Sequence, residues 1–385
     1  MALTEITRTG LGGRLGNSVK QVVVGFVMFL VSFGVLYYNE GRTDMSIVAR
    51  TATVLKTESA ADASASGKLV AVEGKITTTE SVSDMFVFSS PARGEITLEQ
   101  SNVLALQRNV EYYAWVEEKN TKTTKNAGGS ETTETTYNYK NEWVTKVPNS
   151  AEFKQADTHV NPQIASDQNA TARVASAALG AYTFDVNTIE LPASEKLAVN
   201  KELFKQLPTN ARVEGSDYVF IGTGTMATPV VGDMRVSYGV VPTGKDVAVF
   251  GKLDGSKLTA FVDAKNNTLY RIFNGTKDTA VATLHGEYSM ALWVFRLIGF
   301  LLMWVGLASL FSPFSTFLDI IPIAGSFSRG LVAAATFVIA LVLSLVTIIV
   351  SAILHSVIAM VIAAVVILGI AVAVMKMRGK KKLAV

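Results

Sequence analysis

The residue types that most often carry out chemistry are few in this chain and lie far apart. None of the 385 residues is cysteine, which excludes thiol catalysis, disulfides and cysteine-ligated metals. The three histidines, His159, His285 and His355, have no neighbouring ligand that could complete a metal site. The carboxylates are dispersed and form no pair with a nucleophile or base. We therefore expect no enzymatic activity, no metal and no cofactor.

One glycine-rich segment, Gly222-Thr223-Gly224-Thr225, has the composition of a phosphate-binding loop. It lacks the preceding strand, the following helix and the downstream acidic residue that a nucleotide-binding loop needs. We interpret the segment as a turn.

Arg296 is a charged residue inside an apolar run, five residues after the run begins. A charge at that depth in a bilayer costs a few kcal/mol unless its side chain reaches the interface or finds a partner. The simpler interpretation is that Arg296 extends to the outer interface of the membrane. The sharper hypothesis is an ion pair with Glu40, which lies at the end of another apolar run.

Small residues recur at helical spacing in the apolar runs. Gly299 and Gly306 share one helical face with Arg296, and Ala340 and Ser344 share another with Thr336 and Ser351. Small faces allow helices to approach closely in lipid. We expect these faces to pack within the chain, with self-association as a second use.

Four apolar runs are long enough to cross a bilayer, which takes about 20 residues in a helix. We predict transmembrane helices at residues 19–38, 291–311, 331–354 and 357–375. They separate four other segments, at residues 1–18, 43–289, 312–330 and 376–385. Basic residues precede the first run as in a signal peptide, but no cleavage site follows, which favours a retained anchor.

The charge distribution predicts the orientation of these spans. Residues 43–289 carry 24 basic and 29 acidic side chains, whereas the rest of the chain carries 11 basic and 3 acidic ones. Basic residues flanking apolar spans favour the cytoplasm and are not the pattern of a nucleic-acid binder. We therefore expect both termini in the cytoplasm and residues 43–289 on the opposite side. The membrane is then a bacterial inner membrane or, in a eukaryote, the endoplasmic reticulum and nuclear envelope.

The connection at residues 312–330 is unusually apolar for a cytoplasmic loop. Phe314, Phe317, Leu318 and Ile321 form a short amphipathic face before Pro322 breaks the pattern. One interpretation places this face in the membrane interface with Asp319 turned towards water. The alternative is a simple connector.

Residues 43–289 are predicted to form a β-rich α+β domain. Alternating apolar residues favour strands at 68–79, 135–147, 232–241, 247–253, 258–262 and 269–273. Asp254-Gly255 favours a hairpin turn. We expect helix only at 194–207, with Ser194 as its N-cap, and in an alanine-rich stretch at 171–180.

Two further features of this domain stand out. Residues 117–136 are rich in lysine, threonine, glycine and asparagine, which predicts a solvated hairpin tip or, less simply, a contact arm for a partner. A short echo relates Val70–Lys75 to Val247–Lys252, although six residues are too few to establish a duplicated domain.

Four segments, in order along almost the whole chain, carry a family resemblance. They are Tyr37-Tyr38-Asn39-Glu40-Gly41-Arg42; Thr136-Tyr137-Asn138-Tyr139 with Glu142-Trp143; Val231-Gly232-Asp233-Met234-Arg235-Val236-Ser237-Tyr238; and Arg296 to Gly306. In these segments the chain resembles the LUMA family of four-span membrane proteins, typified by an inner nuclear membrane protein, and is interpreted as a prokaryotic-like member. The resemblance implies a membrane organiser that oligomerises and associates with other envelope proteins, and it carries no catalytic residues.

We therefore expect a non-enzymatic membrane scaffold that binds the lipid bilayer, itself and other, unidentified membrane proteins. One alternative is a small-molecule channel or transporter, which needs polar residues along a route through the membrane. Another is a membrane-anchored enzyme, which needs a cleft with convergent catalytic groups in the outer domain.

Overall fold

The computed structural model describes residues 3–57, 62–91, 93–126, 128–164, 168–319, 322–356, 360, 361 and 365, with the backbone alone for 322–329. The chain forms two compact units. The helical unit contains Ile6–Thr43, Thr121–Glu134 and the chain from Gly286 onwards. The β-rich unit contains the chain up to Glu5, Asp44–Asn120 and Thr135–His285.

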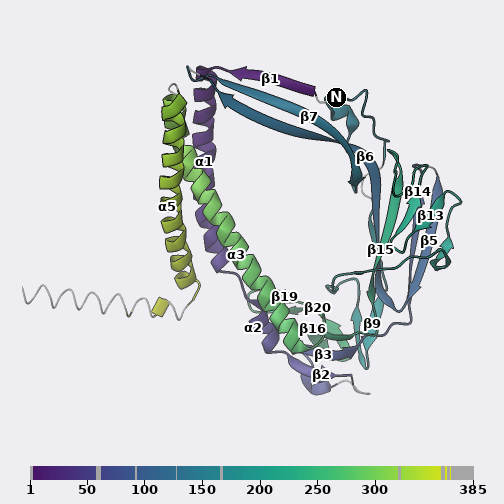
Figure 1. The fold of residues 1–385 in the computed structure, drawn as a ribbon. Coiled ribbons are helices and arrows are strands. Elements are labelled where there is room, and N and C mark those ends of the chain that lie inside the picture. Colours follow the sequence, from purple (N-terminus) through teal and green to yellow (C-terminus); the bar gives the residue numbers. More distant parts are fainter. Residues whose placement is uncertain are drawn as a thin grey trace, which may run out of the picture. The chain divides into compact units, whose positions relative to one another are not determined.

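Three long helices dominate the helical unit (Figure 1): α1 (Leu11–Glu40), α3 (Lys277–Leu310) and α5 (Pro322–Leu354). Candidate membrane spans lie in Leu11–Arg50, Lys277–Leu310 and Gly330–Leu354. The predicted spans 19–38 and 331–354 lie within the first and third of these, and 291–311 extends one residue beyond the end of the second. An uninterrupted apolar helix satisfies its own backbone groups in lipid. The predicted fourth span, 357–375, lies outside the described residues apart from three isolated positions.

The connection between α3 and α5 is more helical than predicted. It contains α4 (Ser312–Leu318), and α5 then begins at Pro322. The predicted amphipathic face runs to Ile321, which lies outside the described residues, whereas α4 ends at Leu318. Pro322 begins the next helix, because the first helical position needs no backbone N–H donor. Phe314 and Phe317 of α4 are exposed, and their placement in the membrane interface stays a prediction.

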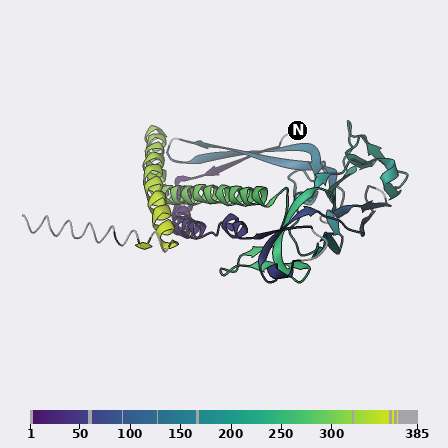
Figure 2. The same cartoon turned by 90° about the horizontal axis from the view of Figure 1, so that it is seen from below.

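The long helices of this unit lie close together (Figure 2), and an apolar core joins α1, α3 and α5 to one another. Leu36 of α1, Met303 of α3 and Ala340 of α5 are fully buried in it. The space around them is filled mainly by aromatic and large aliphatic side chains: Phe29, Phe33, Phe300, Trp304, Leu307, Leu343 and Ile348.

In the β-rich unit, the larger sheet is antiparallel and has the order β1-β7-β6-β15-β14-β13, with β11 on β15 and β8 on β6. The bounds are β1 (Leu3–Thr9), β6 (Val103–Lys125), β7 (Glu131–Val144), β8 (Ala170–Arg173), β11 (Glu195–Lys196), β13 (Ala211–Glu214), β14 (Tyr218–Ile221) and β15 (Met234–Pro242). The last residues of β1 and β6 and the first of β7 belong to the helical unit.

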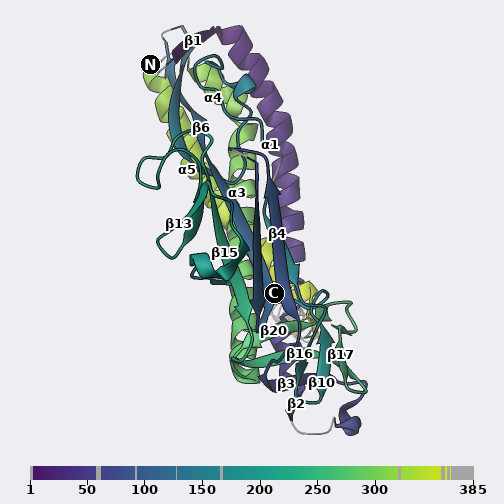
Figure 3. The same ribbon diagram turned by 90° about the vertical axis from the view of Figure 1, so that its right-hand side faces the viewer.

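A second sheet has the order β2-β3-β16-β17-β10-β9, with β20 on β16 (Figure 3). Its strands are β2 (Thr53–Lys56), β3 (Leu69–Lys75), β9 (Ser176–Leu179), β10 (Tyr182–Asp185), β16 (Asp246–Asp254), β17 (Lys257–Thr259) and β20 (Arg271–Asn274). Smaller sheets contain β4 (Ser81–Phe88), β5 (Gly94–Ser101) and β12 (Phe204–Gln206), and β18 (Phe261–Val262) with β19 (Thr268–Leu269). The short helix α2 (Met45–Arg50) precedes β2.

The two echoing segments of the sequence pair with each other. β3 and β16 are antiparallel neighbours, with Val70 opposite Gly251 and Val72 opposite Val249. Their similar alternation therefore reflects a shared position in the centre of one sheet. The hairpin that follows β16 turns at Gly255 and Ser256, because Asp254 and Lys257 are already paired and Gly255 has a φ of 60°.

The core of this unit is large and aromatic, with Tyr182, Phe184, Tyr238, Ile96, Leu98 and Leu104 among its fully buried side chains. One ion pair lies within it: Arg108 of β6 donates to the Asp84 carboxylate of β4 at 2.5 Å, and both side chains are buried. Arg108 also lies over the Phe86 ring, 4.1 Å from its centroid. A buried pair of this kind is sensitive to the loss of either partner.

Both helices predicted in this unit are wrong. Residues 194–207 form β11, a 3₁₀ turn at Lys201–Leu203 and β12. Ser194 caps no helix and donates instead to the Gln107 side chain at 2.8 Å. Residues 171–180 form β8 and β9. In each case pairing with an existing strand, such as Leu197 N–H to Tyr238 C=O, outweighs local helix propensity.

Glu80 joins two sequence-distant segments of the β-rich unit. Its carboxylate accepts hydrogen bonds from the backbone amides of Ala175 at 2.7 Å and Ser176 at 3.1 Å, and from the Ser176 hydroxyl at 2.9 Å. The Ala175 amide and then the Ser176 hydroxyl lower the pKa of Glu80 below its ordinary value, because they stabilise the charged form.

The glycine at position 306 generates a testable prediction about the helical unit. A Cβ on Gly306 would lie 2.7 Å from the Phe29 nitrogen and 2.8 Å from the Gly25 oxygen of α1. Backbone atoms cannot move aside as a flexible side chain can, so we expect Gly306→Ala to destabilise the full-length protein by about 1–3 kcal/mol. Thermal unfolding in mild detergent measures this.

The matched control is Gly286→Ala in the same helix, where a Cβ meets nothing within 4 Å. We expect it to be neutral or slightly stabilising, because alanine has the higher helix propensity. Equal unfolding temperatures for the two variants would contradict the packing of α1 on α3.

Candidate functional site

Polar side chains gather at both ends of the helical unit. At the C-terminal end of α1, the Glu40 carboxylate accepts two hydrogen bonds from the Arg296 guanidinium, each 2.8 Å long. The Glu40 side chain is 5% exposed and that of Arg296 is 22% exposed. Arg296 thus has a bidentate partner on α1, which is the arrangement expected if Glu40 and Arg296 form an ion pair. The contribution of this pair to stability stays a prediction.

Neighbouring residues make further contacts at the C-terminal end of α1. Arg296 also lies over the Trp293 ring, 4.9 Å from its centroid, and Arg42 lies 4.4 Å from that of Phe295. The Asn39 side chain donates to the Leu292 carbonyl at 3.0 Å. Two helices are therefore joined by side-chain contacts of several kinds within about one turn.

The small residues singled out in the sequence lie on packed helix faces. A Cβ on Gly299 would meet the Leu36 side chain at 2.5 Å, and one on Gly306 would meet the α1 backbone. Ala340 and Ser344 of α5 are buried. These residues pack within the chain, which is the first of the two uses expected for them, and their use in self-association stays a prediction.

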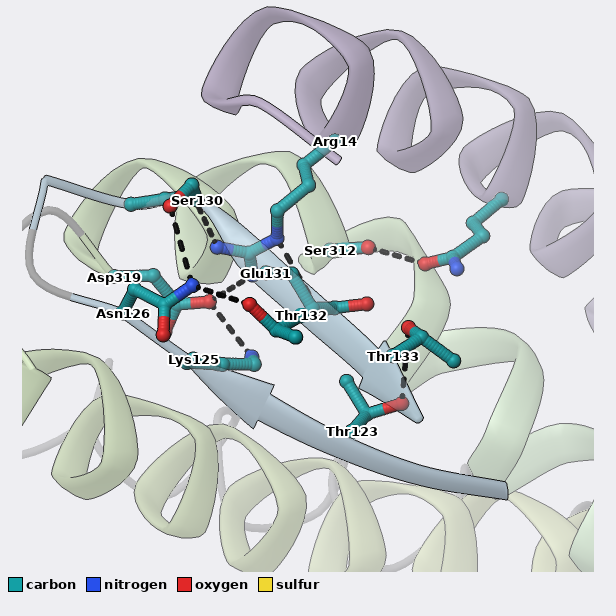
Figure 4. Close-up of polar contacts among 12 residues, drawn as sticks. Arg14, Thr123, Lys125, Asn126, Ser130, Glu131, Thr132, Thr133, Ser312 and Asp319 are labelled. Carbon is teal, nitrogen blue, oxygen red and sulfur yellow. Dashed lines mark hydrogen bonds and ion pairs between the residues drawn. The ribbon is translucent and has the colours of Figure 1, made fainter. Parts of the chain in front are cut away.

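At the opposite end of α1, four charged side chains meet (Figure 4): Arg14, Lys125, Glu131 and Asp319. Asp319, just after α4, accepts from Arg14 and, at 2.7 Å, from the Lys125 ammonium. Arg14 also donates to the Gly129 carbonyl at 2.7 Å, and its Nε lies 3.3 Å from the Glu131 carboxylate. The cluster therefore joins α1, the end of α4 and the tip of the β6–β7 hairpin.

The hairpin tip, residues 121–134, is shaped by its own hydrogen bonds. The Asn126 amide donates to the Ser130 carbonyl at 2.8 Å, and the Asn126 side chain donates to the Thr132 hydroxyl at 2.9 Å. Gly128 and Gly129 have φ values of 80° and 78°, which favour glycine. This turn directs the Gly129 carbonyl and Glu131 at Arg14.

The interpretation that turned Asp319 towards water is wrong. Asp319 is 3% exposed and Arg14 is 8% exposed, because each neutralises the other where water is largely excluded. The sequence marked Arg14 only as a basic residue before the first span. Asp319 lies 305 residues further on, and no local spacing connects the two.

The contacts of the hairpin tip limit how the chain can cross a bilayer. If α1 crosses a bilayer, Arg14 and Thr43 lie on opposite faces of that bilayer. Gly129 and Glu131 contact Arg14, and Lys125 contacts Asp319, the partner of Arg14. The expectation that all of residues 43–289 lie opposite the N-terminal segment stays a prediction, and the contact between residues 121–134 and the start of α1 gives a reason to test it for that part of the chain.

A cavity of about 510 Å³ adjoins the charged cluster. Its polar wall contains Asn17 and Gln21 of α1 and Ser312 and Thr316 of α4, besides the four charged residues. Its apolar wall contains Trp304, Val305 and Ala308 of α3 and Val332 and Ala333 of α5. Trp304 is held by a 3.0 Å hydrogen bond from its indole N–H to the Ala333 carbonyl.

In the β-rich unit, two of the resembling segments meet. The buried Asp233 carboxylate accepts from the amides of Thr223 at 2.9 Å, Gly224 at 3.1 Å and Val230 at 2.7 Å. The glycine-rich segment at 222–225 is thus a turn around a carboxylate, as interpreted. Arg235 forms a bidentate pair with Glu111 and lies 4.5 Å from the Trp143 ring centroid, which indicates a structural role.

Each histidine has its own set of neighbours. His159 stacks on Tyr139, His285 Nδ1 lies 2.9 Å from Asp44 Oδ2, and the His355 ring lies 4.5 Å from that of Tyr37. Within the part of the chain that the structure describes, no group of three or more His, Cys, Asp or Glu side chains could hold a metal ion.

Comparison with known proteins gives consistent matches. The family model described as "Transmembrane protein 43" matches residues 112–357. The mouse protein of that name is 25% identical over 339 residues, which cover 83% of this chain and 81% of the mouse protein. The human protein is 26% identical, covering 82% and 80%. The Drosophila melanogaster homolog is 24% identical, covering 73% and 74%. No solved structure matches the chain.

The ion pair between Glu40 and Arg296 leads to a prediction about exchanging the two charges. We expect Glu40→Arg and Arg296→Glu each to lower the unfolding temperature of the detergent-solubilised protein, because each leaves two like charges in contact. The double variant should recover part of the loss, with a coupling energy of about 0.5–3 kcal/mol. A double variant no more stable than the sum of the two single losses would rule out the pair as a stabilising contact.

The hairpin tip predicts a sidedness result that the cysteine-free chain makes simple to measure. A single cysteine at Thr124 should react with a membrane-impermeant maleimide from the same side of sealed vesicles as one at Gly12, because the tip contacts the start of α1. Asp254→Cys marks the body of the β-rich unit and should react from the other side. If Thr124→Cys reacts together with Asp254→Cys, the contact between the tip and Arg14 does not form in the membrane.

Proposed function

Since the chain belongs to the transmembrane protein 43 family, we propose that it is a non-enzymatic membrane scaffold that self-associates and binds other membrane proteins. This is the family that the resemblance named LUMA indicated. The protein is an integral, multi-pass membrane protein with three candidate spans and a β-rich unit. Beyond family membership, we propose the scaffold role and the binding of partner proteins.

The observation that carries the proposal is the polar hairpin tip held at the start of α1 by Arg14 and Asp319. Residues 117–136 contain almost no apolar side chain. Lipid offers no hydrogen-bond partners, so strands of this composition cannot face hydrocarbon and have to be enclosed by protein or water. A chain that carries such an arm across the membrane therefore needs protein neighbours there.

A second copy of the chain is the natural neighbour. Each copy carries the same polar arm, and a closed symmetric ring turns all arms towards one another and the apolar helix faces towards lipid. α1, α3 and α5 present many exposed apolar side chains, such as Val23, Ile298 and Val338, which suit contact with lipid or with neighbouring spans. Self-association through the arm leaves these faces free for other membrane proteins.

We propose the orientation that the charges favour, with both termini in the cytoplasm and the body of the β-rich unit on the opposite side. Residues 1–18, 312–330 and 376–385 then lie in the cytoplasm, and the predicted spans 19–38, 291–311, 331–354 and 357–375 cross the membrane. Residues 121–134 are the exception, at the cytoplasmic face with Arg14.

A channel is the second candidate function, and the same arm favours it. Within one chain, the core around Met303 is filled by Phe29, Phe300 and Trp304, which supports no route through the described helices. A ring of polar arms, however, encloses a polar path between copies. Membrane-anchored catalysis has less support, because the charged clusters described above are used in structural contacts.

Crosslinking in the native membrane tests the scaffold. We expect full-length Thr124→Cys to form dimers and larger species with a short bis-maleimide, and Arg14→Gln in the same background to weaken them by releasing the tip. Asp254→Cys is the matched control, since it lies in an exposed turn of the β-rich unit. If the Thr124→Cys thiol reacts with the bis-maleimide but forms no crosslinked species, and the protein has a monomeric mass in detergent, self-association through the arm is rejected. Conductance of the crosslinked species in planar bilayers would favour the channel.

A further inference from the structure

The cavity beside Arg14 has two chemically different walls. Towards the ends of the helices it is lined by amides and hydroxyls, including those of Asn17, Gln21 and Ser312. Deeper along α3 and α5 it is lined by Trp304, Val305 and Ala333. At about 510 Å³ it lies within the range of small-molecule sites, about 300–1,000 Å³. Its occupant should therefore be amphipathic.

Among the described side chains that line the polar wall, the charges are balanced. Arg14 and Lys125 supply two positive charges, and Glu131 and Asp319 supply two negative ones. An occupant with a net charge would leave that charge uncompensated in a partly dehydrated place. A zwitterionic occupant brings one charge of each sign and keeps the balance.

The two cations retain hydrogen-bond donors for such an occupant. In the described part of the chain, Lys125 Nζ contacts Asp319, which uses one of its three N–H groups. The Arg14 guanidinium contacts Gly129, Glu131 and Asp319, which leaves some of its five donors free. Phosphate oxygens are acceptors that suit both groups.

The position of the cavity indicates which class of amphipathic molecule it fits. It begins at α4 and the neighbouring ends of α1 and α3, and it follows α3 from Ser309 to Trp304, which is about one and a half helical turns into the apolar part of that helix. This is the depth at which a phospholipid changes from headgroup to acyl chain. We propose that the cavity binds one zwitterionic phospholipid, with its phosphate at Arg14 and Lys125 and the start of an acyl chain against Trp304 and Ala333.

Lipid retention by the full-length protein tests this site. The protein is extracted into mild detergent, exchanged extensively and analysed by native mass spectrometry, then titrated with phosphatidylcholine, phosphatidylglycerol or inorganic phosphate. We expect one retained zwitterionic lipid per chain, at least ten-fold preferred over phosphatidylglycerol. Inorganic phosphate should not displace it, because phosphate lacks the apolar part.

Ala333→Trp fills the apolar wall and should lower lipid occupancy at least ten-fold. Val338→Trp is the matched control on the same helix. Val338 is exposed, so this variant should retain the lipid. Lys125→Gln removes a phosphate donor without filling space and should weaken binding several-fold, which keeps the test valid if Ala333→Trp fails to fold. Equal retention by wild type, Ala333→Trp and Lys125→Gln would overturn the proposal, as would equal binding of phosphatidylglycerol.

Discussion

The closest helix contact in the described part of the helical unit that the glycines reveal is the approach of α1 and α3. At Gly25 and Gly306 the two helices leave no room for a side chain, since a Cβ on either would lie within 3 Å of the other helix. Helices in lipid gain nothing from excluding water, so close van der Waals contact has to hold them together. α1 and α3 also precede and follow the segment from Asp44 to Asn274, so their packing brings its two ends together.

Ion pairs at the two ends of α1 complete what close packing begins. Glu40 with Arg296 and Arg14 with Asp319 each place opposite charges where neither could remain alone at low cost. The close contact at Gly25 and Gly306 restricts how the helices can slide or rotate, and directional charged hydrogen bonds at both ends of α1 further define their register. The apolar core around Leu36 and Met303 supplies attraction, and the paired charges determine which arrangement is formed.

The polar hairpin links the helical packing to the proposed assembly. Its tip is bound at the start of α1 through Arg14, Lys125 and Asp319, although its composition is unsuited to lipid. In the proposed scaffold, further copies of the chain enclose this arm. The adjoining cavity is the site proposed for a phospholipid, so both proposals concern the same end of α1.

Residue types alone predicted the three spans for which the structure has a candidate helix, and the β-rich character, because hydropathy, charge bias and strand alternation are local properties. The family was indicated instead by the resemblance of four short segments. Residue types also suggested the Glu40–Arg296 pair, since a lone charge in an apolar run needs a partner. They misjudged Asp319 and residues 171–180 and 194–207, whose outcomes depend on partners distant in the chain. Burial of Asp319 requires Arg14, and β11 requires β15. Only the folded chain brings these together, because long-range pairing outweighs local preference when it satisfies a buried charge or an open strand edge.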